Sequence, residues 1–310
     1  MVSTNISVIV PVFNSANNLK ELNERILNVL NNLQVIYEII YVDDGSQDNS
    51  HSILKELRLS NQKIKLIPLS KNYGQHNAIL CGIRSANYNT VITLDDDLQN
   101  PPEEIPKLLK KLSDGFDVVY GYPEKEKHSL YRNLASIFTK MALKTAMGID
   151  NAKYVSSFRA FNTILRNSFN QYKGSFISID VLLSWGTNSF TAIPVGHNER
   201  KIGKSNYTFR KLVQHALNML TGFSILPLQI ASIIGFILSL FGLGVLIFVV
   251  GRFVFQGSPV PGFPFLASII AIFSGAQLLA IGIIGEYLAR QHFRMLNKPQ
   301  YFIKDEYSDN

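Results

Sequence analysis

Three consecutive aspartates, Asp95, Asp96 and Asp97, follow an apolar run in the segment TVITLDDDLQNPPEEIP, residues 90–106. Adjacent carboxylates repel one another and lose solvation when buried, so they need a cation, bulk solvent or a helix end nearby. In an extended segment, successive side chains point to opposite sides. We therefore expect Asp95 and Asp97 to face one cation, while Asp96 contacts the ligand differently or meets solvent.

The residue types around these aspartates favour a hard divalent cation. Carboxylates with Gln99 and Glu103 close by can hold Mg²⁺ or Mn²⁺ through one or two oxygens and leave room for phosphate and water. Such a cation would act as a Lewis acid that neutralises a diphosphate leaving group. The alternative is a solvated turn into a helix opened by residues 101–104, whose glutamates suit the helix dipole. That alternative leaves the three aspartates unexplained.

Other catalytic chemistries lack their sequence signatures. No G-x-G-x-x-G motif follows the first apolar strand and no G-x-x-x-x-G-K-[ST] motif occurs, which argues against dinucleotide oxidoreductases and P-loop NTPases. The six histidines are scattered and Cys81 is the only cysteine, so neither a zinc cluster nor a Cys-His nucleophile pair is indicated. A lone cysteine also excludes an internal disulfide and fits a reducing compartment.

The front two thirds of the chain alternates between strand and helix patterns. Short β-branched apolar runs predict strands at residues 6–13, 37–44, 64–70, 90–97 and 117–122. Apolar residues at helical spacing predict helices at residues 17–33, 49–60, 75–86 and 102–115. Because the strands are apolar on both faces, they indicate an α/β domain with a mostly parallel sheet covered by helices.

The ends of these strands are where the chemistry is expected. In parallel sheets of this kind, ligands bind beyond the carboxyl ends of the strands. Asp43 and Asp44 stand at the end of the second predicted strand, and the three aspartates from Asp95 to Asp97 stand at the end of the fourth. These carboxylates therefore mark the edge of the sheet where a site should be sought.

Two long apolar runs in the last third predict membrane spans. Residues 228–250 are almost purely apolar, and at about 1.5 Å per helical residue such a run is long enough to cross a bilayer core. A second uncharged run, residues 265–285, follows a linker whose prolines break the helix. Basic residues precede the first run and follow the second, so both chain ends are expected in the cytoplasm. A pair of buried core helices is the alternative.

Two amphipathic segments carry apolar residues at helical spacing with basic residues at the polar edge. Residues 209–223 lead directly into the first apolar run, so we interpret them as a helix lying on the membrane surface. Residues 128–147 fit a surface-lying helix or a helix packed on its own domain equally well. The net charge of +7, from 30 Lys+Arg against 23 Asp+Glu, suits an anionic partner such as phosphate or lipid headgroups.

Six motifs, in their order and spacing, resemble those of family 2 glycosyltransferases with a GT-A fold: VPVFN, VDDGSQDNS, SKNYGQHNA, LDDDLQNPPE, SSFRAF and ERKIGKSNYTFRKL. More narrowly, the chain resembles the polyprenyl-phosphate glycosyltransferases, which include dolichol-phosphate mannose synthases and bactoprenol glucosyltransferases. The resemblance covers essentially the whole chain, including both apolar runs. A D-x-D motif alone is a weak signal, but its combination with the downstream Arg-x-x-Gly-x-Ser element is specific.

The resemblance implies a nucleotide-sugar site at the front of the domain. Pro11, Phe13 and Asp43 would line the nucleotide base and ribose, and Asp44 would lie beside them. Asp96 would also belong to the donor-binding residues, between the two metal-side aspartates. These roles place the donor at the carboxyl ends of the first, second and fourth predicted strands.

The resemblance also implies which residues meet the phosphates. Asp95 and Asp97 take the two aspartate positions of the family D-x-D motif and Gln99 its following glutamine, and these would hold the metal. Arg200 matches an arginine that approaches the diphosphate or the acceptor phosphate, and Ser205 belongs to the same loop. Asp97 and Arg200 are therefore the expected catalytic residues. The basic cluster that begins at Arg200 can serve as a membrane-surface patch instead of, or together with, this role.

The activity implied by the resemblance is inverting transfer of a sugar from a nucleoside diphosphate sugar, with UDP expected, to undecaprenyl or dolichyl phosphate. The expected cofactor is Mg²⁺ or Mn²⁺, and the expected partners are the donor, the lipid and the membrane, without nucleic acid. A homo-oligomer is left open. One rival is a processive polysaccharide synthase, which would carry a Q-x-x-R-W element and more spans. The other is a non-catalytic membrane protein with a decayed transferase domain.

Four positions depart from the family pattern. Ser15 stands where an acidic residue is common, Tyr122 follows the strand end where an arginine is common, and Asn206 replaces a lysine. Ser157 replaces an aspartate that is a candidate general base in many relatives. A phosphate monoester has a second pKa of about 6, so such an acceptor needs positioning more than deprotonation. We therefore assign no base, and Asp150 is only a distant substitute.

The expected domain organisation follows from these segments. The resemblance implies a GT-A domain at residues 1–208. We expect this domain to stay in the cytoplasm, because the start of the chain lacks a basic n-region and a small-residue cleavage site. The remaining boundaries are a juxtamembrane helix at 209–224, spans at 225–251 and 263–286, and a cytoplasmic tail at 287–310. The chain is thus expected to be integral to the cytoplasmic membrane.

Overall fold

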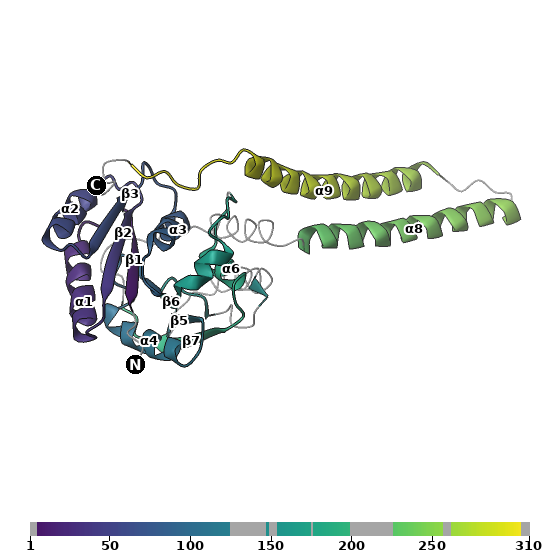
Figure 1. The fold of residues 1–310 in the computed structure, drawn as a ribbon. Coiled ribbons are helices and arrows are strands. Elements are labelled where there is room, and N and C mark those ends of the chain that lie inside the picture. Colours follow the sequence, from purple (N-terminus) through teal and green to yellow (C-terminus); the bar gives the residue numbers. More distant parts are fainter. Residues whose placement is uncertain are drawn as a thin grey trace. The chain divides into compact units, whose positions relative to one another are not determined.

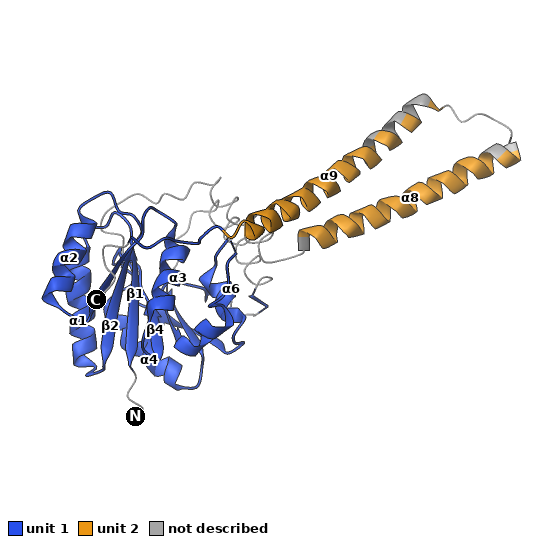
Figure 2. Ribbon diagram, turned by 45° about the horizontal axis from the view of Figure 1, so that its top comes forward, with its two compact units in different colours: residues 1–216, 298–310 blue, residues 217–297 orange. Residues whose placement is uncertain are grey.

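The computed structural model describes residues 5–124, 147–148, 154–174, 176–198, 226–256 and 262–304 of the 310-residue chain. The chain divides into two compact units, one of residues Met1–Ala216 with Lys298–Asn310 and the other of residues Leu217–Asn297. Figure 2 colours the two units separately. The first unit holds the sheet, and the second consists of two long helices.

A mixed, mostly parallel sheet with the strand order β3-β2-β1-β4-β6-β5-β7 forms the centre of the first unit. Strand β6 pairs antiparallel with β4 and β5, and the other pairings are parallel. The strand bounds are β1 Ile6–Val12, β2 Tyr37–Asp43, β3 Ile64–Pro68, β4 Thr90–Thr93, β5 Val118–Pro123, β6 Arg159–Asn162 and β7 Phe190–Val195. The predicted α/β class and the five predicted strands are confirmed.

Helices cover both faces of this sheet (Figure 1). Their bounds are α1 Leu19–Asn32, α2 Ser50–Ser60, α3 Gln75–Ser85, the 3₁₀ helix η1 Pro102–Glu104, α4 Ile105–Ser113, the 3₁₀ helix η3 Thr163–Ser168 and α6 Ile179–Ser184. The strand period of two explains the layering. Val8 and Val10 of β1 join the buried cluster that includes α1, α2 and α4, whereas Ile9 faces Gly82 of α3.

The second unit contains α8, Leu226–Gln256, and α9, Phe263–Met295. Within them, residues Pro227–Arg252 and Ile272–Met295 are long and apolar enough to cross a membrane, and neither apolar window is buried inside the protein. This exposure counts against the alternative of buried core helices in a soluble protein. Helix α9 continues through residues 287–295, which the sequence interpretation assigned to a tail.

The segment 298–304, which follows α9, belongs to the first unit and was not predicted to have structure there. The Ser70 N–H donates to the Phe302 carbonyl at 2.9 Å, and the Lys304 N–H donates to the Pro68 carbonyl at 2.9 Å. Ile303 forms an antiparallel bridge with Leu69. The segment therefore covers part of the outer edge of β3, the first strand in the sheet order.

Several predictions concern residues outside the described ranges. They include the amphipathic segment 209–224, residues 128–146 of the other amphipathic segment, and Asp150. Arg200, Ser205 and Asn206 also lie there. Their predicted roles therefore stay predictions.

Candidate active site

The carboxyl ends of β1, β2 and β4 meet at one edge of the sheet, as the sequence predicted. Val12 pairs with Asp43 in the parallel register of β1 and β2. Just beyond, the Asp44 N–H donates to the Val12 carbonyl at 2.8 Å, and the Phe13 N–H donates to Asp96 Oδ2 at 3.1 Å. The loops after all three strands are therefore bonded to one another directly.

Asp43 and Asp44 have different tasks although they are adjacent and equally buried, each with 3% of its surface exposed. Asp43 accepts a hydrogen bond from the Ser46 N–H at 3.0 Å, and its other oxygen lies 2.9 Å from His51 Nδ1. Asp44 instead accepts the N–H groups of two residues that precede α3, at 2.7 and 2.8 Å. Burial raises the pKa of Asp44, and these two hydrogen bonds oppose the rise. Asp44 thus fastens the start of α3 to the end of β2.

The glycine that follows these aspartates allows a close approach between two loops. Gly45 has φ +69°, and a Cβ atom there would lie 2.5 Å from the backbone carbonyl carbon of Lys71. A residue with a side chain would meet both a strained backbone and a backbone clash. Gly45 therefore keeps the loop after β2 against the loop that leads into α3.

Asp96 turns back toward the end of β1. Its Oδ2 accepts hydrogen bonds from the Phe13 N–H at 3.1 Å and from Ser15 Oγ at 2.5 Å. Burial raises the pKa of Asp96, and the Ser15 and Phe13 hydrogen bonds oppose the rise. Ser15, which stands where relatives were expected to carry an acidic residue, thus serves as a hydrogen-bond donor to Asp96.

Asp95 takes its partners from other elements. Gln75 Nε2, on the first residue of α3, donates to Asp95 Oδ1 at 2.6 Å, and Ser157 Oγ, just before β6, donates to Asp95 Oδ2. Burial raises the pKa of Asp95 to about 6, and the charge of Asp97 contributes to the increase. Asp95 and Asp96 therefore reach in different directions, although β4 ends at Thr93 and Asp96 lies in a turn rather than in the expected extended segment.

The turn after Asp97 has an unusual backbone. Leu98 is buried and has φ +61°, a left-handed conformation that a residue with a branched side chain rarely adopts. The Gln99 N–H donates to Asp97 Oδ1 at 3.1 Å, and the Gln99 carbonyl accepts the Asn198 N–H at 2.8 Å. Such strain is typical of functional sites, where the surrounding structure holds it in place.

Within the part of the chain that the structure describes, no group of three His, Cys, Asp or Glu side chains is placed to hold a metal ion. Glu103, which the sequence placed near the acidic run, pairs with Arg25 of α1, with its oxygens 2.9 and 2.7 Å from the guanidinium nitrogens. A metal bound by Asp95, Asp97 and Gln99 thus remains a prediction. It would need further oxygen ligands from a substrate.

Phe13 is an exposed aromatic residue at this edge. Its side chain is 43% exposed, although it directly follows the fully buried Val12. Pro11, which precedes Val12, is buried within β1. An exposed aromatic ring beside buried carboxylates offers a flat apolar surface on which a base can stack.

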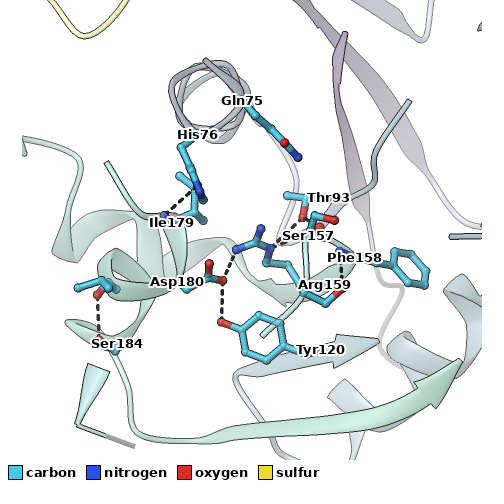
Figure 3. A network of polar contacts seen from close by, with 12 residues as sticks. Gln75, His76, Thr93, Tyr120, Ser157, Phe158, Arg159, Ile179, Asp180 and Ser184 are labelled. Atoms are coloured by element: carbon cyan, nitrogen blue, oxygen red, sulfur yellow. Dashed lines mark hydrogen bonds and ion pairs between the residues drawn. The ribbon is translucent and has the colours of Figure 1, made fainter. Parts of the chain in front are cut away.

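A buried polar network behind the site was not found by sequence reasoning (Figure 3). Arg159 of β6 is 2% exposed and forms an ion pair with Asp180 of α6, which also accepts a hydrogen bond from the Tyr120 hydroxyl at 2.9 Å. On its other side, Arg159 Nε donates to Thr93 Oγ1 at 3.1 Å. Only the motif SSFRAF pointed to this region, because the partners lie in β4, β5 and α6.

Comparisons of the sequence with known proteins identify relatives of the chain. Residues 7–172 match the family model described as Glycosyl transferase family 2. The chain is 36% identical over 303 residues to the undecaprenyl-phosphate 4-deoxy-4-formamido-L-arabinose transferase of Pectobacterium atrosepticum. This alignment covers 97% of this chain and 93% of the relative. The protein of the same name from Photorhabdus laumondii is 36% identical over 309 residues, with 98% and 95% covered.

Among solved structures, the chain is similar to glucosyl-3-phosphoglycerate synthase from Mycobacterium tuberculosis. The complex of that enzyme with Mn²⁺ and UDP-glucose gives a TM-score of 0.51 at 16% identity, covering 70% of this chain and 77% of that chain. A second structure of the enzyme gives 0.50 at 17% identity, covering 70% and 78%. At this identity the likeness concerns the fold.

Proposed function

The chain belongs to glycosyl transferase family 2, and from this membership we propose that it transfers a sugar from a nucleoside diphosphate sugar to undecaprenyl phosphate. The observation that carries the proposal is the 36% identity over 97% of the chain to a relative named for transfer to undecaprenyl phosphate. That alignment extends beyond the sheet domain into the two apolar helices. A lipid acceptor also accounts for those helices, which a soluble acceptor would not require.

The donor is a UDP-sugar that binds at the carboxyl edge of β1, β2 and β4. The exposed ring of Phe13 stacks on the base, with Pro11 behind it and Asp43 near the ribose. Asp43 is buried and fixed by the Ser46 N–H and by His51, so its orientation is set before the nucleotide arrives. The sugar of the named relatives, 4-deoxy-4-formamido-L-arabinose, is the first donor sugar to be tested.

A divalent cation, Mg²⁺ or Mn²⁺, fits the acidic residues of the site. Both described hydrogen bonds to Asp95 come from neutral groups, an amide and a hydroxyl, and the charge of Arg159 lowers the Asp95 pKa less than the charge of Asp97 raises it. Asp97 adds charge close enough to raise the pKa of Asp95. Asp95, Asp97 and Gln99 would hold the cation together with the donor phosphates. When bound, the cation supplies Lewis-acid stabilisation of the departing diphosphate.

The acceptor phosphate attacks the anomeric carbon opposite the leaving group, which inverts the configuration at that carbon. With a second pKa of about 6, the phosphate monoester is already largely dianionic at neutral pH, so positioning contributes more than a general base. Ser157 suits this assignment, because its hydroxyl is committed to Asp95. Arg200 and Ser205 complete the phosphate contacts in the proposal.

The proposed topology places the sheet unit and both chain ends on the cytoplasmic side of the membrane. Helices α8 and α9 would cross the membrane and keep the site near the lipid headgroups. The domain boundaries proposed here are a catalytic unit at 1–208, a surface helix at 209–224, spans at 225–251 and 263–286, and a cytoplasmic segment at 287–310. The first residues of that last segment continue α9 to Met295, and residues from Lys298 onward belong to the sheet unit.

Nucleotide binding can be tested before the lipid product is sought. Thermal unfolding of the detergent-solubilised full-length chain should shift upward with UDP plus Mn²⁺, because a ligand that binds only the folded state stabilises it. A smaller shift is expected with GDP plus Mn²⁺ or with UDP plus EDTA. Equal shifts with all nucleotides, or none with any, would contradict the proposed donor site.

A further inference from the structure

Ser157 occupies a position where many family members were expected to place an aspartate, and the structure gives it a different task. We propose that Ser157 and Gln75 are positioning residues that fix the Asp95 carboxylate in the orientation needed to bind the cation and the donor phosphates. We further propose that the buried pair of Arg159 and Asp180 fixes Ser157 for this task. The inference rests on the proposed function, because it concerns how Asp95 is held.

The two donors address different oxygens of Asp95. Gln75 Nε2 donates to Oδ1 at 2.6 Å, while Ser157 Oγ donates to Oδ2. A carboxylate has about four lone-pair sites, so one hydrogen bond to each oxygen leaves acceptor capacity on both. The two donors lie on either side of Asp95 in the sequence, with Gln75 at the start of α3 and Ser157 two residues before β6. Together they stop rotation about the side-chain bonds of Asp95 without using up its capacity to bind a cation.

Ser157 is itself held at its backbone. Its carbonyl accepts a hydrogen bond from Thr93 Oγ1 at 2.5 Å, and Arg159 Nε lies 3.5 Å from the same oxygen. Thr93 also accepts the stronger Arg159 hydrogen bond at 3.1 Å. Figure 3 shows Arg159 between Asp180 on one side and Thr93 and Ser157 on the other. The position of the Ser157 hydroxyl is therefore set by groups buried behind the site.

The buried pair is suited to this supporting task. Arg159 is 2% exposed, Asp180 is 4% exposed and Tyr120, which bonds Asp180, is fully buried. A pair of charges buried this deeply contributes little net stability to the fold. Removing one partner is strongly destabilising, because the other charge is left buried and unpaired, so the paired arrangement is strongly favoured. A residue that binds a metal must be held in one orientation. Mutation of the groups that hold such a residue typically lowers metal affinity or activity about 10–100-fold.

Gln75 is held through α3. The two N–H groups that precede Gln75 donate to the Asp44 carboxylate at 2.7 and 2.8 Å. At the opposite end of the helix, Arg84 donates to the side chain of Gln300 and to the carbonyls of Asn170 and Tyr172, at 2.8–2.9 Å. Both ends of α3 are thus fastened. The amide of Gln75 therefore approaches Asp95 from a fixed helix.

The test measures Mn²⁺ binding in the presence of UDP, by electron paramagnetic resonance of free Mn²⁺, on the full-length chain in detergent. Ser157→Ala is expected to weaken Mn²⁺ binding about 10–100-fold, the range typical of outer partners of a metal ligand. Ser157→Thr keeps the hydroxyl and should recover binding to within about threefold of the wild type. Gln75→Leu should weaken binding about tenfold.

Ser156→Ala is the matched control. It removes a hydroxyl from the neighbouring residue, which accepts a hydrogen bond from the Phe158 N–H at 3.2 Å and has no described contact with Asp95. Mn²⁺ binding should match the wild type. Thr93→Val tests the support behind Ser157, because it removes the hydroxyl that bonds the Ser157 carbonyl. We expect Thr93→Val to weaken Mn²⁺ binding and Thr93→Ser, which keeps the hydroxyl, to bind Mn²⁺ as the wild type does. Thermal unfolding of each variant verifies that it is folded.

The outcomes separate this inference from the proposed function. If the wild type binds Mn²⁺ with UDP and Ser157→Ala binds it equally well or more tightly, the positioning role is refuted while the donor site stands. If Ser157→Ala and Ser156→Ala lose binding equally, the effect is structural and the positioning role is also refuted. If the wild type binds neither Mn²⁺ nor UDP, the proposed function fails and the inference fails with it.

Discussion

Asp95 places a carboxylate in a partly buried site beside two other carboxylates, and this arrangement costs stability. Its pKa is about 6 in the folded chain, compared with 3.8 for an unperturbed aspartate, chiefly because burial disfavours the charged form. Since the folded state binds the proton more tightly, protonated Asp95 stabilises the fold. That contribution is fully present below about pH 4 and is lost as the pH rises through about 6. Above this range, the shift corresponds to about 3 kcal/mol of lost stability.

Asp95→Asn should therefore stabilise the protein while it damages the site. In the absence of metal and nucleotide, we expect the melting temperature to rise by roughly 5 °C at pH 7.5 and to change little at pH 4.5. An asparagine can still accept from Gln75 and donate to Ser157, so the local hydrogen bonds survive. Thermal unfolding at both pH values tests this prediction. A gain of equal size at both pH values would show that the buried charge is not the cause.

The sequence predicted different directions for Asp95 and Asp96 from alternation along an extended segment, but β4 ends at Thr93 and a turn at Asp96 produces the difference. The sequence could not predict the partners of Asp95. Gln75 and Ser157 are 20 and 62 residues away along the chain, and only the packing of α3 and β6 brings them to the carboxylate. Reading Ser157 only as a missing base therefore overlooked its hydrogen bond.

The loop after β2 gives a sharper test of local geometry. Gly45→Ala places a methyl group against the backbone of Lys71, only 2.5 Å from its carbonyl carbon, at φ +69°. We expect a loss of about 2 kcal/mol or more, because both strain and a backbone clash oppose the alanine. Urea or thermal unfolding measures the loss.

Gly115→Ala is the matched control for this prediction. Gly115 also has a positive φ, +100°, but nothing lies within 4 Å of the added Cβ. Its alanine variant should lose only about 1 kcal/mol, from backbone strain alone. Equal losses in the two variants would mean that the contact with Lys71 is unimportant.

The segment 298–304 pairs with the last residue of β3 and with the two residues that follow it, and we predict that the fold depends on this pairing. Truncation after Asn297 removes the hydrogen bonds to Ser70 and Pro68, and it removes Gln300 from Arg84. An uncovered edge strand promotes aggregation, so the melting temperature should fall by several degrees and light scattering should increase. Truncation after Lys304 retains these contacts and should behave like the full chain. Indistinguishable unfolding of the two truncations would contradict the prediction.

Two strands, β6 and β7, were not predicted from the sequence, because each contains a residue that is uncommon in strands. β6 has only four residues and begins with Arg159, whose charge is tolerated only because Asp180 pairs with it. β7 contains Pro194, which lowers its strand propensity, and it lies at the edge of the sheet, where a proline is acceptable. By contrast, β1 and β2 are buried throughout and consist mostly of apolar residues, so local pattern alone was sufficient to predict them.

The proposed topology can be tested with single cysteines, because the native Cys81 is fully buried and is the only cysteine in the chain. Leu59 of α2 is 88% exposed, so Leu59→Cys should react readily with a membrane-impermeant maleimide. We expect labelling in inside-out vesicles and none in intact spheroplasts. Ser258→Cys, in the linker between the apolar helices, should show the opposite pattern. Labelling of both variants from the same side would refute two spans with a cytoplasmic catalytic unit.

The central claim joins a nucleotide-sugar site to a lipid phosphate acceptor in one chain, and product formation tests it most directly. The full-length chain in detergent is incubated with a labelled UDP-sugar panel and Mn²⁺, with or without undecaprenyl phosphate, and lipid-linked sugar is measured after organic extraction. We predict a labelled lipid that requires undecaprenyl phosphate, disappears with EDTA and falls at least about 100-fold in Asp97→Ala, since metal stabilisation of the leaving group supplies several kcal/mol. Lipid-linked product that is unchanged in Asp97→Ala, or no product with any donor in the panel, would contradict the account.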